Sequence, residues 1–192
     1  MGEFGIGQPV PREEDPYLVR GAGRYVDDVA APGQTRAYVL RSPHSHARIA
    51  KIDATAARAL PGVRLILTGN DPEVLALGLQ RPWHQRKRRD GTPAFISPQP
   101  LLARERVRYI GDPVALIVAE TIAQAKDAAE AIEVDYEALP AVTAVADAVA
   151  PGAPAVWDAC PDNQAFVHEL GNKAAVASIL AMRAWEWGDR SR

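Results

Sequence analysis

The stretch RVRYIGDPVALIVAETIAQAKDAAEAIEVDYE, residues 106–137, carries the pattern that decides the fold. Its first part predicts two strands, residues 106–110 and 114–119, which we expect to pair around the turn Gly111-Asp112-Pro113. The second of these runs, VALIVA, is apolar throughout. A strand without a polar side is expected to be buried on both faces of a sheet.

The second part of the stretch predicts a helix and a further strand. Thr121, followed three residues later by Gln124, is a capping box that opens a helix over residues 122–131. Residues 132–137 then alternate apolar and polar side chains. This alternation predicts a half-buried strand with Ile132, Val134 and Tyr136 facing inward.

Upstream of this stretch, turn residues divide the chain into further short elements. Asp53 and Asp71 each stand where a helix N-cap is expected, and Pro72 suits a first helical position. The predicted elements are strands at 36–42, 48–52 and 63–68, and helices at 54–60 and 72–77. This order predicts an α+β (mixed α/β) domain with a mixed β-sheet and a few short helices.

The two ends of the chain differ in composition from its middle. Residues 1–35 are dense in glycine and proline, which predicts a long irregular segment that wraps over the domain surface. We therefore expect the domain itself at residues 36–170 and a tail at residues 171–192. The tail carries apolar residues that could form one face of a short helix: Val176, Ile179, Leu180 and Trp187.

Composition bounds the class of protein. The 192 residues are 47% hydrophobic and 24% charged, as in soluble globular proteins, and the net charge of −2 argues against a dedicated nucleic-acid binder. Cys160 is the single cysteine, so the chain can form no internal disulfide and no multi-thiolate metal site by itself. Residues 1–10 do not have the pattern of a signal peptide, and no stretch reaches the roughly 18 apolar residues of a membrane span. We expect a cytoplasmic protein.

His44 and His46 have the spacing that places two imidazoles on one face of a strand, where they could ligate a metal. Zinc or copper would need further ligands, and His84, Cys160 and His168 lie far away in the sequence without a pattern. Because Pro43 precedes the pair, we favour a turn in which both histidines hydrogen-bond the loop.

Glycine pairs and paired acids offer weaker signals. The sequences GIG at 5–7 and GAG at 21–23 lack the third glycine of a dinucleotide-binding loop, and neither follows a predicted strand. Glycines in tight turns are the better explanation. Asp27 and Asp28 are neighbours in an extended segment, so they point to opposite sides and are not expected to share a proton.

The one basic patch is RPWHQRKRR, Arg81 to Arg89, in a segment flanked by proline and glycine. Trp83 within it could stack on a base. The acidic residues of 127–137 balance the charge, so a solvated loop or a protein docking surface is favoured over nucleic-acid binding. The residues by themselves thus give a globular domain with no identifiable active site.

Several blocks, in order, resemble the large subunit of the xanthine dehydrogenase/aldehyde oxidase family, closest to its carbon monoxide dehydrogenase-like branch. The blocks are GIGQPVPREEDPYLVRGAGRYVDDV, YVLRSPHSHARIAKID, ALPGVRLILTGND, VRYIGDPVALIVAETIAQAKDAAEAIEVDYEALPAV and GNKAAV. The resemblance extends over about residues 4 to 176. It implies the N-terminal α/β hammerhead domain of that subunit. His44, His46 and the GAG turn then belong to family scaffold segments.

Family enzymes hydroxylate carbon centres or oxidise carbon monoxide at a molybdenum ion held by a pterin, and pass electrons to two-iron two-sulfur clusters and usually FAD. The resemblance implies that the residues holding these groups lie in later domains. We therefore expect no catalytic, cofactor-binding or metal residue in this chain. The expected partners are molybdenum-binding, iron–sulfur and flavin subunits or domains, with no nucleic acid and no membrane.

The segment ASILAMRAWEWGDRSR, residues 177–192, does not resemble the family. The resemblance therefore predicts a structural or assembly domain that lacks the molybdenum-pterin domains and is inactive alone. A frameshift, a truncated gene, an engineered boundary or a separate small subunit would each give this picture. The alternative is an orphan domain that acts as a protein-interaction module without a catalytic role.

Overall fold

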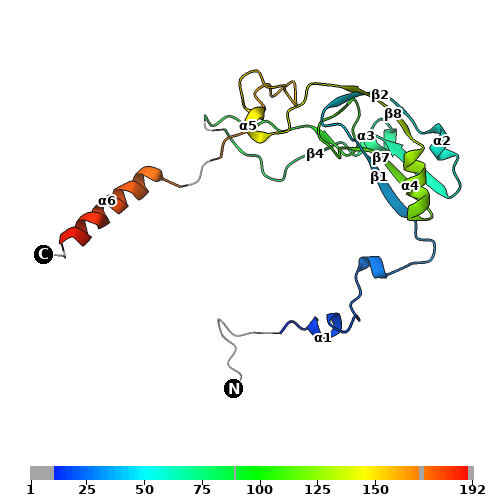
Figure 1. The fold of residues 1–192 in the computed structure, drawn as a ribbon, viewed down its shortest axis with the longest axis horizontal. Coiled ribbons are helices and arrows are strands. Elements are labelled where there is room, and N and C mark those ends of the chain that lie inside the picture. Colours follow the sequence, from blue (N-terminus) through cyan, green and yellow to red (C-terminus); the bar gives the residue numbers. More distant parts are fainter. Residues whose placement is uncertain (1–10, 89, 169–170, 190–192) are drawn as a thin grey trace.

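β7 (Pro113–Ala119) is the central strand of the largest sheet in the computed structural model. It lies between β1 (Arg36–Arg41) and β3 (Val63–Thr68) and runs antiparallel to both (Figure 1). These three strands confirm the strands predicted from the sequence. The structure describes residues 11–88, 90–168 and 171–189.

A second sheet is formed around β2 (Ala47–Asp53), which pairs with β6 (Arg106–Val107) and with β8 (Glu133–Ala138). A small third sheet joins β4 (Leu79–Gln80) to β5 (Gln99–Pro100). The α+β class with short helices is confirmed. In detail the strands form separate antiparallel sheets in the described residues, where a mixed sheet was expected. The strand directions follow from how distant segments meet, since residues 42–112 separate β1 from its partner β7.

The larger of the two cores lies between the β1–β7–β3 sheet and α4 (Ile122–Glu130). Ala125 and Ala128 of α4 are fully buried with Ile66 and Ile117 of the sheet. Alanine side chains allow the helix backbone to come close to the strands, so α4 covers one face of the sheet. On β7, Val114 belongs to a second buried cluster with Ala47 and Val107, which joins the two sheets. Its residues Leu116 and Val118 are half-buried.

The predicted pairing of residues 106–110 with 114–119 is wrong. β6 pairs with β2, and β7 pairs in the other sheet, so the chain crosses between sheets at residues 108–112. The Arg108 amide donates to the Asp112 carboxylate at 2.9 Å, and Gly111 adopts a φ of 90°. The Gly111 amide donates to the Ser42 carbonyl at 2.8 Å. These bonds stabilise a wide turn where a two-strand hairpin was expected, because a side-chain carboxylate takes the place of a ladder partner.

The capping box of α4 is confirmed: Gln124 accepts from the Thr121 amide, and the Thr121 hydroxyl accepts from the Gln124 amide. The two other predicted caps differ from this one. Asp53 accepts from the Thr55 amide at the start of α2 (Thr55–Arg58), but the N-cap itself is Ala54.

Asp71 is the N-cap residue of α3 (Pro72–Ala76), as predicted, but its carboxylate forms no capping bond to the helix and instead accepts from the Thr68 hydroxyl at 2.9 Å. This bond closes a tight turn over Gly69. A Cβ at Gly69 would collide with the backbone carbonyl of Ala103, so only glycine lets the two segments approach this closely.

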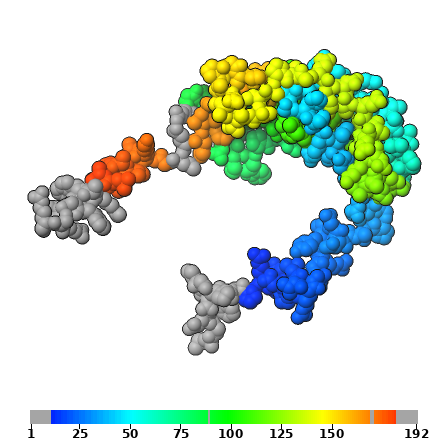
Figure 2. All heavy atoms as spheres, in the orientation of Figure 1, coloured from blue at the N-terminus to red at the C-terminus, as the bar shows by residue number. Residues whose placement is uncertain are grey.

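Both ends of the described chain project from the sheets (Figures 1 and 2). Residues 11–35, with α1 (Asp15–Leu18) and the 3-10 turn η1 (Val26–Asp28), contain no buried residue. That this segment wraps over a domain stays a prediction. After α5 (Val145–Ala148), the chain ends in α6 (Lys173–Asp189). No helix among the described residues is both long enough and apolar enough to cross a membrane.

Candidate functional site

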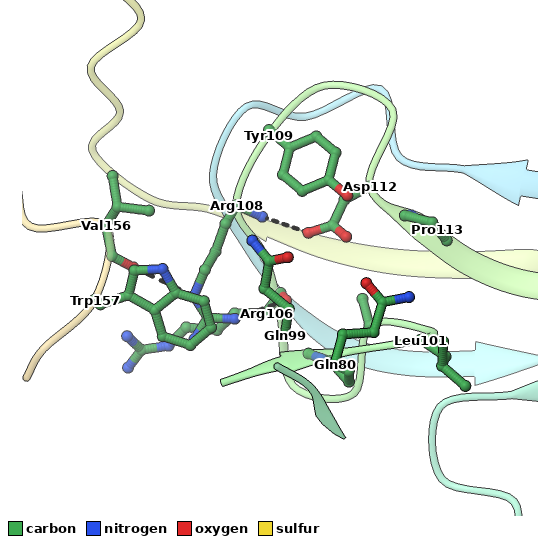
Figure 3. Close-up of a pocket in the computed structure, with 12 residues that line it drawn as sticks. Gln80, Gln99, Leu101, Arg106, Arg108, Tyr109, Asp112, Pro113, Val156 and Trp157 are labelled. Atoms are coloured by element: carbon green, nitrogen blue, oxygen red, sulfur yellow. Dashed lines mark hydrogen bonds between the residues drawn. The ribbon is translucent and has the colours of Figure 1, made fainter. Parts of the chain in front are cut away.

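A cavity of about 240 Å³ lies where four segments distant in sequence meet: β4, β5, the 106–113 crossing and the 156–157 loop. Figure 3 shows its lining side chains, which combine an aromatic wall with charged and amide groups. The cavity exists because the crossing turn carries residues 108–112 away from both sheets. We describe it as the candidate site, since it is a partly enclosed hollow that brings charged, amide and aromatic side chains together.

Arg108 and Trp157 form one wall of the cavity. The guanidinium carbon of Arg108 lies 3.6 Å from the centroid of the Trp157 ring, which places the cation against the electron-rich face of the indole. Arg108 also donates from Nε to the Val156 carbonyl and from Nη1 to the Arg106 carbonyl, both at 3.3 Å. Burial and the neighbouring charge of Arg106 lower the pKa of Arg108. Its side chain is thereby fixed and partly desolvated.

Asp112 lies at the opposite side of the cavity, next to Tyr109 (Figure 3). Its carboxylate accepts the Arg108 amide at 2.9 Å and the Tyr109 hydroxyl. Burial raises the pKa of Asp112 in spite of these hydrogen bonds. Burial and the adjacent carboxylate also raise the pKa of Tyr109. Asp112 is therefore primarily a structural acceptor that closes the crossing turn.

Two glutamines supply the neutral part of the lining. Gln80 and Gln99 face each other across the β4–β5 pair, and their amide groups border the cavity in Figure 3. Arg106 pairs with both carboxylate oxygens of Asp158 at 3.1 Å, so its charge is balanced. The cavity thus offers amide donors and acceptors beside an aromatic face.

The loop that carries Trp157 is fastened by Asn163. Its side-chain oxygen accepts from the Val156 amide at 2.8 Å, and its side-chain nitrogen donates to the carbonyls of Ala148 and Pro154, each at 2.9 Å. Asn163 has a φ of 54°, a conformation that asparagine adopts more readily than most residues. The Asn163 side chain therefore helps to fix the position of the loop that carries the Trp157 ring.

The lining can recognise a polar group. Its twelve residues combine the side-chain amides of Gln80 and Gln99 with the Arg108 cation and the Trp157 ring. Its single carboxylate, Asp112, accepts the Arg108 amide.

His44 and His46 do not converge on a common point. The buried His46 ring contacts the Pro140 carbonyl through Nδ1 at 2.8 Å, and its Nε2 has no hydrogen-bond partner among the described residues. The His44 ring lies against Tyr136, with centroids 4.7 Å apart. Within the described ranges, no three His, Cys, Asp or Glu side chains gather as a metal site would require.

The remaining residues that the sequence singled out and the structure describes do not line the cavity. Asp28 accepts the Tyr25 amide at 2.9 Å, so it serves a local turn beside Asp27. Gly21 adopts a φ of 70°, which suits a tight turn. The GIG sequence at 5–7 lies outside the described residues. Cys160 is buried, and burial together with Asp162 raises the pKa of its thiol.

Sequence reasoning did not identify the cavity residues. The Gly-Asp-Pro sequence at 111–113 indicated a turn, but nothing in the sequence linked it to Trp157 or to Gln80 and Gln99. No periodic pattern connects residues that are brought together only by the crossing of the chain.

Comparison with known proteins identifies the family. The model for "Aldehyde oxidase and xanthine dehydrogenase, a/b hammerhead domain" matches residues 20–140. The chain is 41% identical over 137 residues to the nicotine 6-hydroxylase large subunit of Paenarthrobacter nicotinovorans, covering 71% of this chain and 16% of that subunit. It is 38% identical over 186 residues to the carbon monoxide dehydrogenase large chain of Afipia carboxidovorans, covering 97% of this chain and 21% of that one.

A solved structure supports the same family assignment. Quinoline 2-oxidoreductase from Pseudomonas putida 86 superimposes with a TM-score of 0.61 at 41% identity, covering 74% of this chain and 17% of that one. The match to the Afipia chain leaves out only about 3% of this sequence, so it includes most of the 177–192 tail that the sequence pattern could not place. The chain spans about a fifth or less of the length of these relatives. It belongs to the aldehyde oxidase and xanthine dehydrogenase family of molybdenum hydroxylases, and residues 20–140 are its α/β hammerhead domain.

Proposed function

We propose that this chain serves as a structural and assembly module of a molybdenum hydroxylase large subunit, an oxidoreductase, and does not itself carry the reaction. The observation that supports this most directly is the apolar surface on both flanks of the hammerhead. Tyr17, Tyr25 and Val26 are exposed in the N-terminal segment, and Ile179 and Leu180 are exposed on α6. Exposed apolar side chains on segments that project from a folded domain are suited to contact with other protein.

The chemistry would come from groups bound elsewhere in the assembly: a molybdenum-pterin, two-iron two-sulfur clusters and usually FAD. The residues of this chain do not fit such groups. A two-iron two-sulfur cluster takes four protein ligands, normally cysteines, whereas Cys160 is the single cysteine and is buried against Asp162. The two histidines of the 44–46 turn face different neighbours, since His46 Nδ1 meets the Pro140 carbonyl and the His44 ring lies against Tyr136. We therefore assign this chain a positioning role, with molybdenum-binding, iron–sulfur and flavin subunits or domains as partners.

A second candidate is an orphan or truncated domain of this family that acts as a protein-interaction module with no catalytic role. The observation that favours it is the exposed basic segment around Trp83, a contact surface that needs no catalytic partner. The two candidates differ in which proteins the chain binds.

Purification from the native host separates them. Tagged full-length chain should bring down molybdenum hydroxylase subunits, and metal analysis should find molybdenum in the complex and not in the isolated chain. Ile179→Asp, in the apolar stripe of α6, should reduce the recovery of those subunits. Val145→Asp, an exposed valine on α5, is the matched control and should leave recovery unchanged. Recovery of no molybdenum hydroxylase subunit by the unaltered chain would leave only the interaction module.

A further inference from the structure

Residues 81–94 are a basic segment, called here the basic hairpin because residues 86–88 within it pair with residues 92–94. Lys87 and Pro93 form an antiparallel bridge, the Arg88 amide donates to the Thr92 carbonyl at 2.8 Å, and the Ala94 amide donates to the Arg86 carbonyl at 3.0 Å. The Asp90 carboxylate closes the turn by accepting the Thr92 amide at 2.9 Å and the Thr92 hydroxyl at 2.6 Å. The cationic side chains therefore extend from an ordered backbone and not from a loose loop.

The hairpin is also fastened to the rest of the domain. The Phe95 amide donates to the Ala165 carbonyl at 3.0 Å, and Arg88 Nε donates to the same carbonyl at 3.4 Å. The Arg86 guanidinium lies 5.4 Å from the centroid of the Phe166 ring. These contacts hold the two arginines against residues 165–166 and leave most of their N–H donors unused.

Charge is strongly separated between the hairpin and the rest of the chain. Residues 81–94 contain five basic residues and one acidic residue, a net charge of +4. Because the whole chain sums to −2, all other residues together carry −6. Positive charges this close together repel one another. The repulsion decreases when a surface of opposite charge approaches.

Among the described residues the cations of the hairpin form no ion pair, and the carboxylates that lie near Arg88 are those of Asp90 and Asp162, which line the same hollow. Elsewhere, arginines and a lysine form ion pairs: Arg48 with Glu137, Lys51 with Asp53, Arg64 with Glu120 and Arg106 with Asp158. Among the residues that the structure describes, no ion pair includes Arg81, Arg86, Lys87 or Arg88. Other exposed cations, such as Arg20 and Arg58, are also absent from these ion pairs, so what distinguishes the hairpin is the concentration of its positive charge.

Trp83, three residues before the paired part of the hairpin, is 94% exposed, more than any other large apolar side chain among the described residues. Tryptophan and arginine are the residue types most enriched at the centres of protein interfaces, where a buried indole supplies area and arginine supplies directed hydrogen bonds. The basic hairpin carries an exposed tryptophan together with exposed arginines, so it offers both the apolar area and the hydrogen-bond donors of such an interface. The −6 of the remaining chain would repel an extended polyanion, which disfavours nucleic acid as the partner.

We propose that the basic hairpin, residues 81–94, is a docking surface for an acidic protein surface, with Trp83 buried in the contact. The proposal rests on the assembly role above, since it takes another subunit of the molybdenum hydroxylase complex as the partner.

The test uses full-length tagged chain in the native host and measures the recovery of molybdenum hydroxylase subunits at low and at high salt. The hairpin variant combines Arg86→Gln, Lys87→Gln and Arg88→Gln. The matched control combines Arg20→Gln, Arg58→Gln and Lys126→Gln, three exposed cations outside the hairpin with the same total change of charge. Trp83→Ala tests the indole separately. All of these side chains are exposed, so unchanged circular dichroism is expected.

We expect about tenfold lower recovery of the subunits for the hairpin variant and for Trp83→Ala, near-normal recovery for the control, and loss of binding at high salt. Normal recovery by the hairpin variant would overturn the docking proposal while the assembly role stands. If the unaltered chain recovers no such subunit, the assembly role fails.

Fluorescence anisotropy with a labelled polyglutamate peptide and a labelled DNA duplex then decides the hairpin's role independently. Peptide binding that the hairpin variant loses would support the proposal. Equal binding by both variants, or preference for the duplex, would overturn it.

Discussion

Replacing Asn163 by alanine should release the loop that carries Trp157. The substitution removes three hydrogen bonds, those to the Val156 amide and to the carbonyls of Ala148 and Pro154. At about 1 kcal/mol for each bond, their loss costs about 3 kcal/mol. Alanine at a φ of 54° adds about 1 kcal/mol, because it lacks the short polar side chain whose local hydrogen bonds let asparagine adopt the left-handed region.

The total of about 4 kcal/mol acts on one loop, so local exchange is the appropriate assay. Hydrogen exchange of the Val156 amide should accelerate by up to about a thousandfold, limited by how easily the loop already opens. Amides of β7 should exchange at unchanged rates, since the loop contributes no residue to the core around Ile117. The Arg108–Trp157 contact should loosen in parallel, which near-ultraviolet circular dichroism reports.

Asn70→Ala is the matched control, because Asn70 is exposed and forms no side-chain hydrogen bond among the described residues. Its effect should stay within about 0.5 kcal/mol. If the Val156 amide exchanges equally in the two variants, Asn163 does not fasten the loop and the account of the cavity wall is wrong. Acceleration that extends to β7 would show that the loop is part of the global folding unit.

Two further predictions concern the core and pH. Ile117→Ala should destabilise the chain by about 4 kcal/mol through lost burial and a residual cavity. Leu65→Ala, at a side chain on the neighbouring strand that is 44% exposed, should cost less than about 1 kcal/mol. Equal urea midpoints for the two variants would contradict the assigned core. The Thr55 amide and Lys51 lower the pKa of Asp53 well below its usual range, so its stabilising contribution is complete above about pH 4 and is lost as pH falls further. Asp53→Asn should therefore lower the urea midpoint at neutral pH and converge with the unaltered chain in acid, and a constant difference between them would refute this sign.

Local sequence patterns predicted element type well. Strands β1, β3, β7 and β8 and helix α4 lie within a residue or two of their predicted bounds. The reason is that periodicity and capping report interactions between residues a few positions apart. The Thr121–Gln124 capping box, for example, is complete within four residues.

Pairing partners were not predictable in the same way. β6 and β7 are neighbours in sequence, yet one pairs with β2 and the other with β1 and β3. The deciding bonds are the Arg108 amide to the Asp112 carboxylate and the Gly111 amide to Ser42. Neither bond leaves a periodic trace in the sequence. The sequence pattern therefore could not show that the expected hairpin would not form.

The 106–137 stretch shows both what local sequence patterns predict and what they do not. By itself the sequence determined that this region contains two β-runs, a capped helix and an alternating strand, and its order of blocks determined the family, because both properties depend on residues close together in the chain. Only the tertiary structure decided that the first β-run joins a different sheet from the second. It also decided that Gln80, Gln99, Arg108, Asp112 and Trp157 enclose one cavity. Contacts of this kind depend on how distant segments cross, and the burial that drives the crossing is shared among residues that no short pattern connects.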